Sequence, residues 1–148
     1  MTEVNVQAQL DTVRKELAKL PMLGPVLWLY ARDENRRFTF VADMDWRLLP
    51  PLVLNQNALY SKHEMPWAYF SWAFVNEAVD ARLRSKTPVI APHEWQCGDI
   101  PWLIDVVSPH GEDPELMKET IARFAPGLMV NALVFSKQGQ LQVLQIQG

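Results

Sequence analysis

The feature that most constrains the fold is a short apolar stretch, residues 102–107 (WLIDVV), which glycine and proline residues bound on both sides. β-Branched and aromatic residues dominate this stretch, and such a run between turn residues is typical of a β-strand. Strands disfavour aspartate, and a buried carboxylate is costly unless it is paired or protonated. Asp105, in the middle of the stretch, is therefore the first candidate for a functional residue.

The rest of the chain alternates helical and strand patterns. Apolar spacing and capping residues predict helices over 4–20, 23–32, 45–54 (interrupted at Pro50-Pro51), 75–84 and 114–124. The other predicted strands cover 58–62, 67–74, 128–135 and 140–147. This order predicts an α+β protein with a mixed, mostly antiparallel sheet flanked by helices. We expect one domain over 1–148, with an N-terminal amphipathic helix over 1–20 and a core over 23–148.

Composition narrows the classes of function. The net charge of −3 gives no general attraction to nucleic acid, so we expect no nucleic-acid partner. A single cysteine excludes an internal disulfide and a zinc cage built from cysteines, and we expect no metal and no tightly bound cofactor. No apolar run approaches the roughly 20 residues that span a bilayer, and the chain does not open with a secretory signal. We therefore expect a soluble cytoplasmic protein.

Three blocks of sequence resemble, in order, those of the toxin-activating lysine acyltransferases, bacterial enzymes that acylate RTX protoxins. The blocks are LGPVLWLYA at 23–31; Leu49-Pro50 and Asn55-Gln56 with PWAYFSWA at 66–73; and WQCGD at 95–99 with WLID at 102–105, Pro109 and Gly111. The resemblance covers about residues 23–124. Several multi-residue blocks in one order are far more specific than a lone short motif.

The resemblance implies a fold similar to that of the Gcn5-related N-acetyltransferases. It also implies transfer of a fatty acyl group from acyl carrier protein to an internal lysine of a protein or peptide acceptor, and a possible homodimer. The family's catalytic pair is a histidine and an aspartate. The aspartate corresponds to Asp105, whereas Arg36 stands at the position of the histidine and Arg37 follows it, where the family also has arginine.

Arg36 departs from the family's pattern in a way that matters chemically. A guanidinium stays protonated, so Arg36 cannot act as a general base. Asp105 could serve as the base with Arg36 as an electrostatic aid, another group could serve, or the activity could be lost. The last alternative gives a second hypothesis, a catalytically degenerate relative that binds an acyl chain or acyl carrier protein. A third is a small-molecule acetyltransferase that accepts CoA thioesters.

Strand alternation places Asp105 on one face with Leu103 and Val107, and the other three residues of the stretch on the opposite face. A carboxylate between two apolar residues is desolvated, which raises its pKa toward that of a base. Such a base would take the proton that an amine loses on attacking a thioester. The alternative interpretation is a structural aspartate that accepts hydrogen bonds from backbone or tryptophan N–H groups.

The resemblance places the acyl donor beside the end of this strand, at Val106, Val107, Ser108, His110 and Gly111. Backbone N–H groups at the start of the following helix form an anion site, and Gly111 would let a phosphate approach closely. His110 could replace the missing imidazole, or it could point away from Asp105.

Further candidates lie on neighbouring segments. Tyr69 and Ser71 share a strand face and could donate hydrogen bonds into the groove, or they could simply pack, as could Trp72 and Trp102. Arg37, with Arg32 and Arg36, gives a basic segment that suits an acidic carrier protein and its phosphate, although a solvated loop has the same composition.

Overall fold

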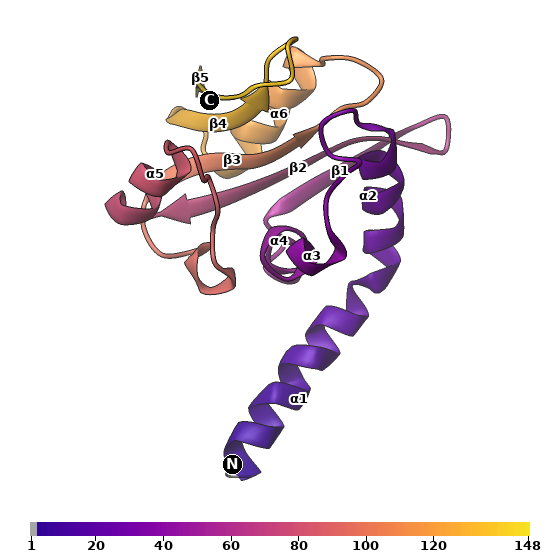
Figure 1. The fold of residues 1–148 in the computed structure, drawn as a ribbon, viewed down its shortest axis with the longest axis vertical. Helices are drawn as coiled ribbons and strands as arrows, with labels where there is room; N and C mark the ends of the chain where they lie inside the picture. The colour runs from indigo at the N-terminus through magenta and orange to yellow at the C-terminus, as the bar shows by residue number, and fades with distance from the viewer. Residues whose placement is uncertain (1–2) are drawn as a thin grey trace.

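Residues 3–148 are described by a computed structural model in which helices flank one five-stranded sheet (Figure 1). The strands follow each other across the sheet in chain order: β1 (Asn57–Lys62), β2 (Met65–Val75), β3 (Ile100–Val107), β4 (Met129–Phe135) and β5 (Leu141–Gln147). β3 and β4 are parallel, and the other neighbouring strands are antiparallel. The expected α+β class with a mixed, mostly antiparallel sheet is confirmed.

Helices and short turns connect these strands. The α-helices are α1 (Glu3–Ala18), α2 (Leu20–Arg32), α3 (Met44–Arg47), α4 (Leu49–Val53), α5 (Glu77–Leu83) and α6 (Pro114–Phe124), and the 3₁₀ helices are η1 (Val41–Asp43) and η2 (Pro92–Glu94). α1 extends away from the sheet (Figure 1). It corresponds to the expected N-terminal helix, of which residues 1 and 2 lie outside the described part of the chain.

Local chemistry explains most of the element boundaries. The Asp113 carboxylate accepts the Leu116 N–H at 3.0 Å and caps α6, as the Asp-Pro pair predicts. The expectation that Pro50 and Pro51 interrupt a helix over 45–54 is wrong. The break lies before the prolines, at Leu48, because proline is tolerated in the first turn of a helix and both prolines lie in the first turn of α4.

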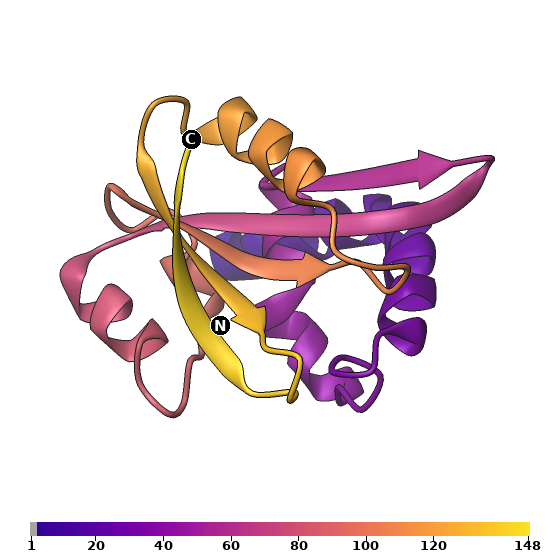
Figure 2. The ribbon, with the colours of Figure 1, turned by 90° about the horizontal axis from the view of Figure 1, so that it is seen from above.

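The alternation of β2 separates the two faces of the sheet. Phe70 and Trp72 pack in a cluster with Ile121 of α6. On the other face, Tyr69 packs against α2 and α4. Ala73 packs against α5 in a neighbouring cluster, which we call the α5 cluster. Figure 2 shows α6 on one side of the sheet and α2 on the other. The sheet is therefore covered on both faces, which is why its central strands are mostly apolar.

A β-bulge lies beside Asp105. Ser71 pairs with Asp105, but the next residue of β2 pairs with Leu103, so Ile104 is the extra residue. Leu103 consequently faces α6, whereas Ile104 turns to the face that carries Asp105 and the adjoining α5 cluster. The expectation that Leu103 shares a face with Asp105 is wrong because a bulge interrupts the two-residue period.

Candidate active site

Asp105 is fully buried near the end of β3, on the face of the sheet that α2, α3 and α4 cover. Its backbone N–H donates to the Ser71 hydroxyl on the neighbouring strand at 3.1 Å. Its side chain is surrounded by charged and polar groups rather than by the apolar ones that the strand alternation predicts. The bulge and the paired strand therefore fix this carboxylate in position.

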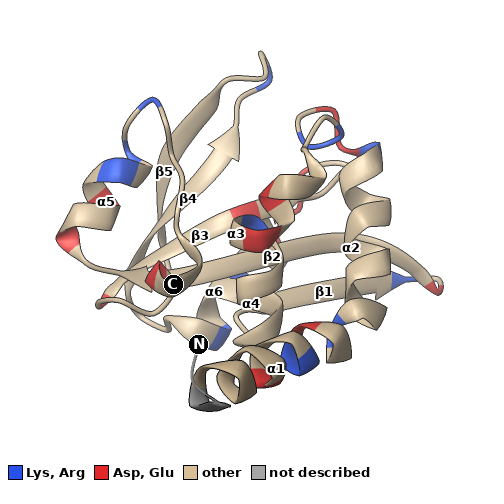
Figure 3. Ribbon diagram, turned by 60° about the horizontal axis from the view of Figure 1, so that its bottom comes forward, with Lys and Arg blue, Asp and Glu red and all other residues tan. Residues whose placement is uncertain are grey.

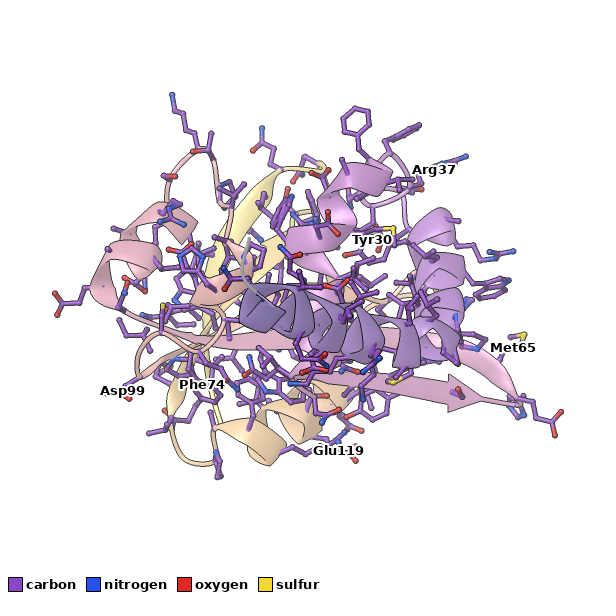
Figure 4. The ribbon with its side chains drawn as sticks, turned by 90° about the horizontal axis from the view of Figure 1, so that it is seen from below. Tyr30, Arg37, Met65, Phe74, Asp99 and Glu119 are labelled. Carbon is purple, nitrogen blue, oxygen red and sulfur yellow. The ribbon has the colours of Figure 1, made fainter. Side chains whose placement is uncertain are left out.

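Two arginines and a tyrosine bind the Asp105 carboxylate. Nη2 of Arg36 and Nη1 of Arg47 each lie 2.9 Å from Oδ1, and the Tyr30 hydroxyl donates to Oδ2. The loop after α2 brings in Arg36, α3 brings in Arg47, and α2 brings in Tyr30. Figure 3 shows the charged segment of α3 against the sheet, and Figure 4 shows Tyr30 among packed side chains. We call Asp105, Arg36, Arg47 and Tyr30 the Asp105 cluster.

The expectation that the pKa of Asp105 is raised is wrong. Burial alone raises the pKa of this carboxyl, but the charges of Arg36 and Arg47 and the hydrogen bonds from Tyr30 and Arg47 outweigh burial and lower it below its ordinary value. A carboxylate held in this way is ionised and a poor proton acceptor. The alternative that it accepts backbone or tryptophan N–H groups is also not what the structure shows. The role of Asp105 as a base stays a prediction, and the geometry favours an orienting role.

Tyr30 and Arg47 keep a fixed ionisation state as well. Burial and the neighbouring Asp105 charge raise the pKa of Tyr30 well above its ordinary value. Burial lowers the pKa of Arg47, but the charges of Asp105 and Tyr30 and the hydrogen bonds to them together outweigh burial, and the net direction is upward. Two cations and one anion thus leave a buried net charge of +1.

Arg36 is held in a short turn after α2. The Asp33 carboxylate accepts the backbone N–H of Arg36 at 3.1 Å, and the Thr39 hydroxyl donates to its carbonyl at 2.7 Å. The side chain is 7% exposed, and its guanidinium lies 4.8 Å from the centre of the Phe135 ring. Arg37, by contrast, is exposed and lies at the edge of the molecule (Figure 4). The structure therefore brings Arg36 to Asp105 but not Arg37.

Sequence reasoning missed Arg47 and Tyr30. Arg47 is the one charged residue in the otherwise apolar stretch 46–54 (WRLLPPLVL), which signals a buried cation that needs an anionic partner. Tyr30 lies near the end of the mostly apolar helix α2, and its hydroxyl was the only sign of a polar neighbour. Neither signal identifies the partner, because Asp105 lies 58 and 75 residues further along the chain.

The remaining candidates on the strands divide between two faces. Tyr69 and Ser71 lie on the face of Asp105, as predicted from their alternation. Trp72 lies on the opposite face, where it stacks on Phe124 with ring centres 4.7 Å apart. Trp102 is fully buried in the α5 cluster and donates its indole N–H to Asp80 at 2.9 Å. The two tryptophans therefore support the core rather than the surroundings of Asp105.

A cavity of about 580 Å³ lies where β3 and β4 separate. These parallel strands pair only at Trp102–Asn131 and Leu103–Ala132, and both continue beyond the last pair. Val106 and Ser108 line the cavity, as expected of donor-binding residues, whereas Val107 is buried in the core against α2 and α4. The apolar part of the wall comes from Phe70, Val106, Met117, Val134, Phe135 and Leu144.

His110 and Gly111 lie in the loop between β3 and α6. Gly111 has a φ of 124°, a conformation that favours glycine. His110 stacks on Trp67 at 4.5 Å and lies 6.4 Å from Trp28. His110 therefore packs against these rings, and the structure does not place it as a substitute imidazole on Asp105.

The start of α6 is acidic rather than cationic. Glu112 and Asp113 line the cavity beside it, and the Asp113 carboxylate already occupies one of its N–H groups. These charges disfavour a phosphate at the helix terminus. Cations gather instead around the tryptophans that contact His110: the Arg32 guanidinium lies 3.6 Å from the Trp28 ring and the Lys62 ammonium 4.5 Å from the Trp67 ring. We call Trp28, Trp67, His110, Arg32 and Lys62 the aromatic–cationic surface.

Over residues 3–148, no group of three or more His, Cys, Asp or Glu side chains is placed to hold a metal ion. In the same part of the chain, no helix has the length and apolar character needed to cross a membrane.

Comparison with known proteins gives consistent results. A sequence model of the RTX toxin acyltransferase family matches residues 15–147. A protein-lysine myristoyltransferase of Kingella kingae is 28% identical over 110 residues, which is 74% of this chain and 66% of that protein. A leukotoxin-activating lysine-acyltransferase of Mannheimia haemolytica is 28% identical over 81% of this chain and 72% of its own length. A protein-lysine myristoyltransferase of Escherichia coli is 28% identical over 87% of this chain and 74% of its own length.

Proposed function

The chain belongs to the RTX toxin acyltransferase family, and from this premise we propose that it transfers a fatty acyl group from acyl carrier protein to the ε-amine of a lysine in a protein or peptide. The observation that carries the proposal is the buried Asp105 cluster, which lies behind one wall of a cavity open between β3 and β4. Relatives named protein-lysine myristoyltransferases support a long acyl chain and a lysine acceptor.

In this reaction the lysine nitrogen attacks the thioester carbonyl carbon. A carbon–nitrogen bond forms, the carbon–sulfur bond breaks, and the proton lost by the nitrogen ends on the carrier's thiolate. Because Asp105 is ionised and both of its oxygens are engaged, its contribution is to hold Arg36 and Arg47 in place rather than to take that proton. Positioning of this kind accounts for a large share of catalysis in many enzymes.

The donor is acyl carrier protein in this proposal, and the protein acts in the cytoplasm where such carriers are loaded. The cavity between β3 and β4 supports it, because its apolar wall suits a pantetheine arm or the start of an acyl chain. We further propose the arrangement of the Gcn5-related N-acetyltransferases, in which a parallel strand pair separates around the donor. Arg32 and Lys62 on the aromatic–cationic surface suit the acidic carrier and its phosphate.

The acceptor side is proposed to be the loop that follows Arg36. Phe38, Phe40 and Val41 are 79%, 77% and 82% exposed, so an apolar surface adjoins the Asp105 cluster. Exposed apolar surface of this kind marks a site of protein interaction. A protein or peptide acceptor that packs on it would bring its lysine to the cluster.

A homodimer through α1 is also part of the proposal. Apolar residues recur along one side of this helix and its continuation at spacings of 4, 3, 4 and 3, and each is between 44% and 56% exposed: Val6, Leu10, Val13, Leu17 and Leu20. This is the spacing of a two-helix coiled-coil seam. A second copy of the same helix is self-complementary to the seam, because every core layer is then apolar.

A second candidate function is a carrier-binding module without catalysis. The substitution of Arg36 for the family's histidine favours it, as does the lowered pKa of Asp105, since neither group is then a general base. The two candidates share the cavity and the aromatic–cationic surface, and they differ only in whether an amide is made.

The test uses myristoyl–acyl carrier protein with an alkyne at the end of the acyl chain, and an extract of a bacterium that produces an RTX protoxin as the source of acceptors. We expect a labelled acceptor whose label survives hydroxylamine, which cleaves thioesters but not amides. The Asp105→Asn protein is the matched control. Carrier binding without a hydroxylamine-resistant product in any extract would support the binding module instead.

A further inference from the structure

Arg36 has a hydrogen-bond donor that nothing in the structure uses. Within residues 3–148, its Nε–H and the Tyr69 hydroxyl are the buried side-chain groups without a partner. Both belong to the surroundings of Asp105, because Arg36 pairs with that carboxylate and Tyr69 lies two residues from Ser71 on the same face. A buried donor that lacks an acceptor is costly, and its presence points to a ligand that supplies one.

The charge of the Asp105 cluster indicates what kind of group Arg36 would bind. Arg36 and Arg47 share one carboxylate, so the buried site carries one uncompensated positive charge. Arg36 offers donors only, since a guanidinium has no acceptor. The group that completes the site is therefore an oxygen that carries, or develops, negative charge.

The position of Arg36 relative to the cavity between β3 and β4 indicates which molecule supplies that oxygen. The Phe135 ring contacts its guanidinium at 4.8 Å and also lines the cavity between β3 and β4. Asp33, whose carboxylate accepts the Arg36 backbone N–H, and Asn35 line the same cavity. Phe135 thus connects the guanidinium of Arg36 to the cavity that we assign to the acyl donor, although Arg36 itself does not line that cavity.

We propose that the Nε–H of Arg36 binds the thioester carbonyl oxygen of the acyl donor and stabilises the oxyanion that forms on it, with Asp105, Arg47 and Tyr30 as the groups that position Arg36. This inference rests on the proposed acyl transfer. As the lysine nitrogen bonds to the carbonyl carbon, the carbonyl electron pair moves onto the oxygen beside Arg36. When the pair returns, the carbon–sulfur bond breaks and the thiolate leaves with the proton that the nitrogen has lost. Arg36 then replaces the histidine of relatives not as a base but as an electrostatic catalyst.

The direct test is the infrared carbonyl band of acyl carrier protein loaded with [1-¹³C]myristate, bound to the full chain without an acceptor. A hydrogen bond to the carbonyl lowers its stretching frequency, so the wild-type complex should show a band shifted to lower frequency than the free donor. In the Arg36→Met and Arg36→Lys complexes the shift should be lost, although the donor still binds. Arg36→Lys keeps a positive charge beside Asp105 but replaces the guanidinium, and with it the Nε–H, by an ammonium, so it remains informative if Arg36→Met does not fold.

Kinetics gives the second readout. Loss of one oxyanion donor costs about 100-fold or more in kcat. Arg36→Lys should therefore lower kcat by about that factor, with little change in the KM for the donor. The control, Arg84→Met at an exposed position, should change neither kcat nor KM. A full band shift in Arg36→Lys would overturn the role of the Nε–H while leaving acyl transfer intact. Absence of donor binding by the wild-type chain would instead overturn the proposed function, and this inference with it.

Discussion

Replacement of Asp105 by asparagine should destabilise the protein as well as abolish transfer. Asparagine keeps the shape of the side chain but leaves two buried guanidinium groups, each 2.9 Å from the lost charge, without an anion. Breaking a buried ion pair by removing one partner costs about 3–5 kcal/mol. For a domain of this size each kcal/mol lowers the melting temperature by roughly 2–4 °C, which gives a fall of about 10 °C.

The assay is thermal and urea unfolding of the wild type, Asp105→Asn and Asp80→Asn. Asp80 is the matched control, because its carboxylate likewise has a hydrogen bond and a salt bridge, but the hydrogen bond is from the Trp102 N–H, at 2.9 Å, and the salt bridge is with the exposed Arg84. The control should lose less than about 1 kcal/mol. Equal stability of the two variants would refute the argument that Asp105 neutralises a buried cation pair.

The same comparison has a defined pH dependence. The folded pKa of Asp105 lies below its ordinary, unfolded value, so its contribution to stability is complete above the unfolded pKa and is lost as the pH falls through the folded pKa. The difference in unfolding free energy between the wild type and Asp105→Asn should therefore be largest at neutral pH and should shrink under acid conditions. A difference that grows as the pH falls would contradict the direction of the shift.

Three further predictions concern the reaction and the surfaces. The transfer rate of the wild type should rise with pH as the acceptor amine loses its proton, without an inflection from an enzyme group near pH 6.5. The Arg36→His variant should show such an inflection. An imidazole-like inflection in the wild type would contradict this prediction. Phe38→Ala with Phe40→Ala should raise the KM for the acceptor and leave the KM for the donor unchanged, as steady-state kinetics with each substrate varied would show. Leu10→Gln with Leu17→Gln should convert a dimer to a monomer in light scattering; an unchanged mass would exclude α1 as the seam.

Much of the fold follows from local pattern. The strand around Asp105, the Asp113 cap of α6 and the β1–β2 turn are encoded in short stretches, so the sequence predicts them. The bulge at Ile104 is different, because it depends on the register between two strands and no local signal marks it. One extra residue there reverses the side of the sheet on which Leu103 lies.

The candidate site was predictable only in part. Asp105 and Arg36 were found from the ill-placed acid and the family pattern, and the structure brings them to 2.9 Å. Arg47 and Tyr30 reach the same carboxylate from distant segments, and their contacts reverse the expected direction of its pKa. The error had a physical cause: desolvation is visible in an apolar strand, whereas the charges that oppose it come from other elements.

Asp105 is an ionised anchor for two arginines and not a general base. The most direct measurement is a ¹³C NMR titration of the side-chain carboxyls in aspartate-labelled protein, with the Asp105 signal assigned by its absence in Asp105→Asn. The Asp105 carboxyl should titrate with a midpoint below its ordinary pKa. A titration midpoint above that ordinary value, toward neutral pH, would contradict the anchoring role and restore Asp105 as the base.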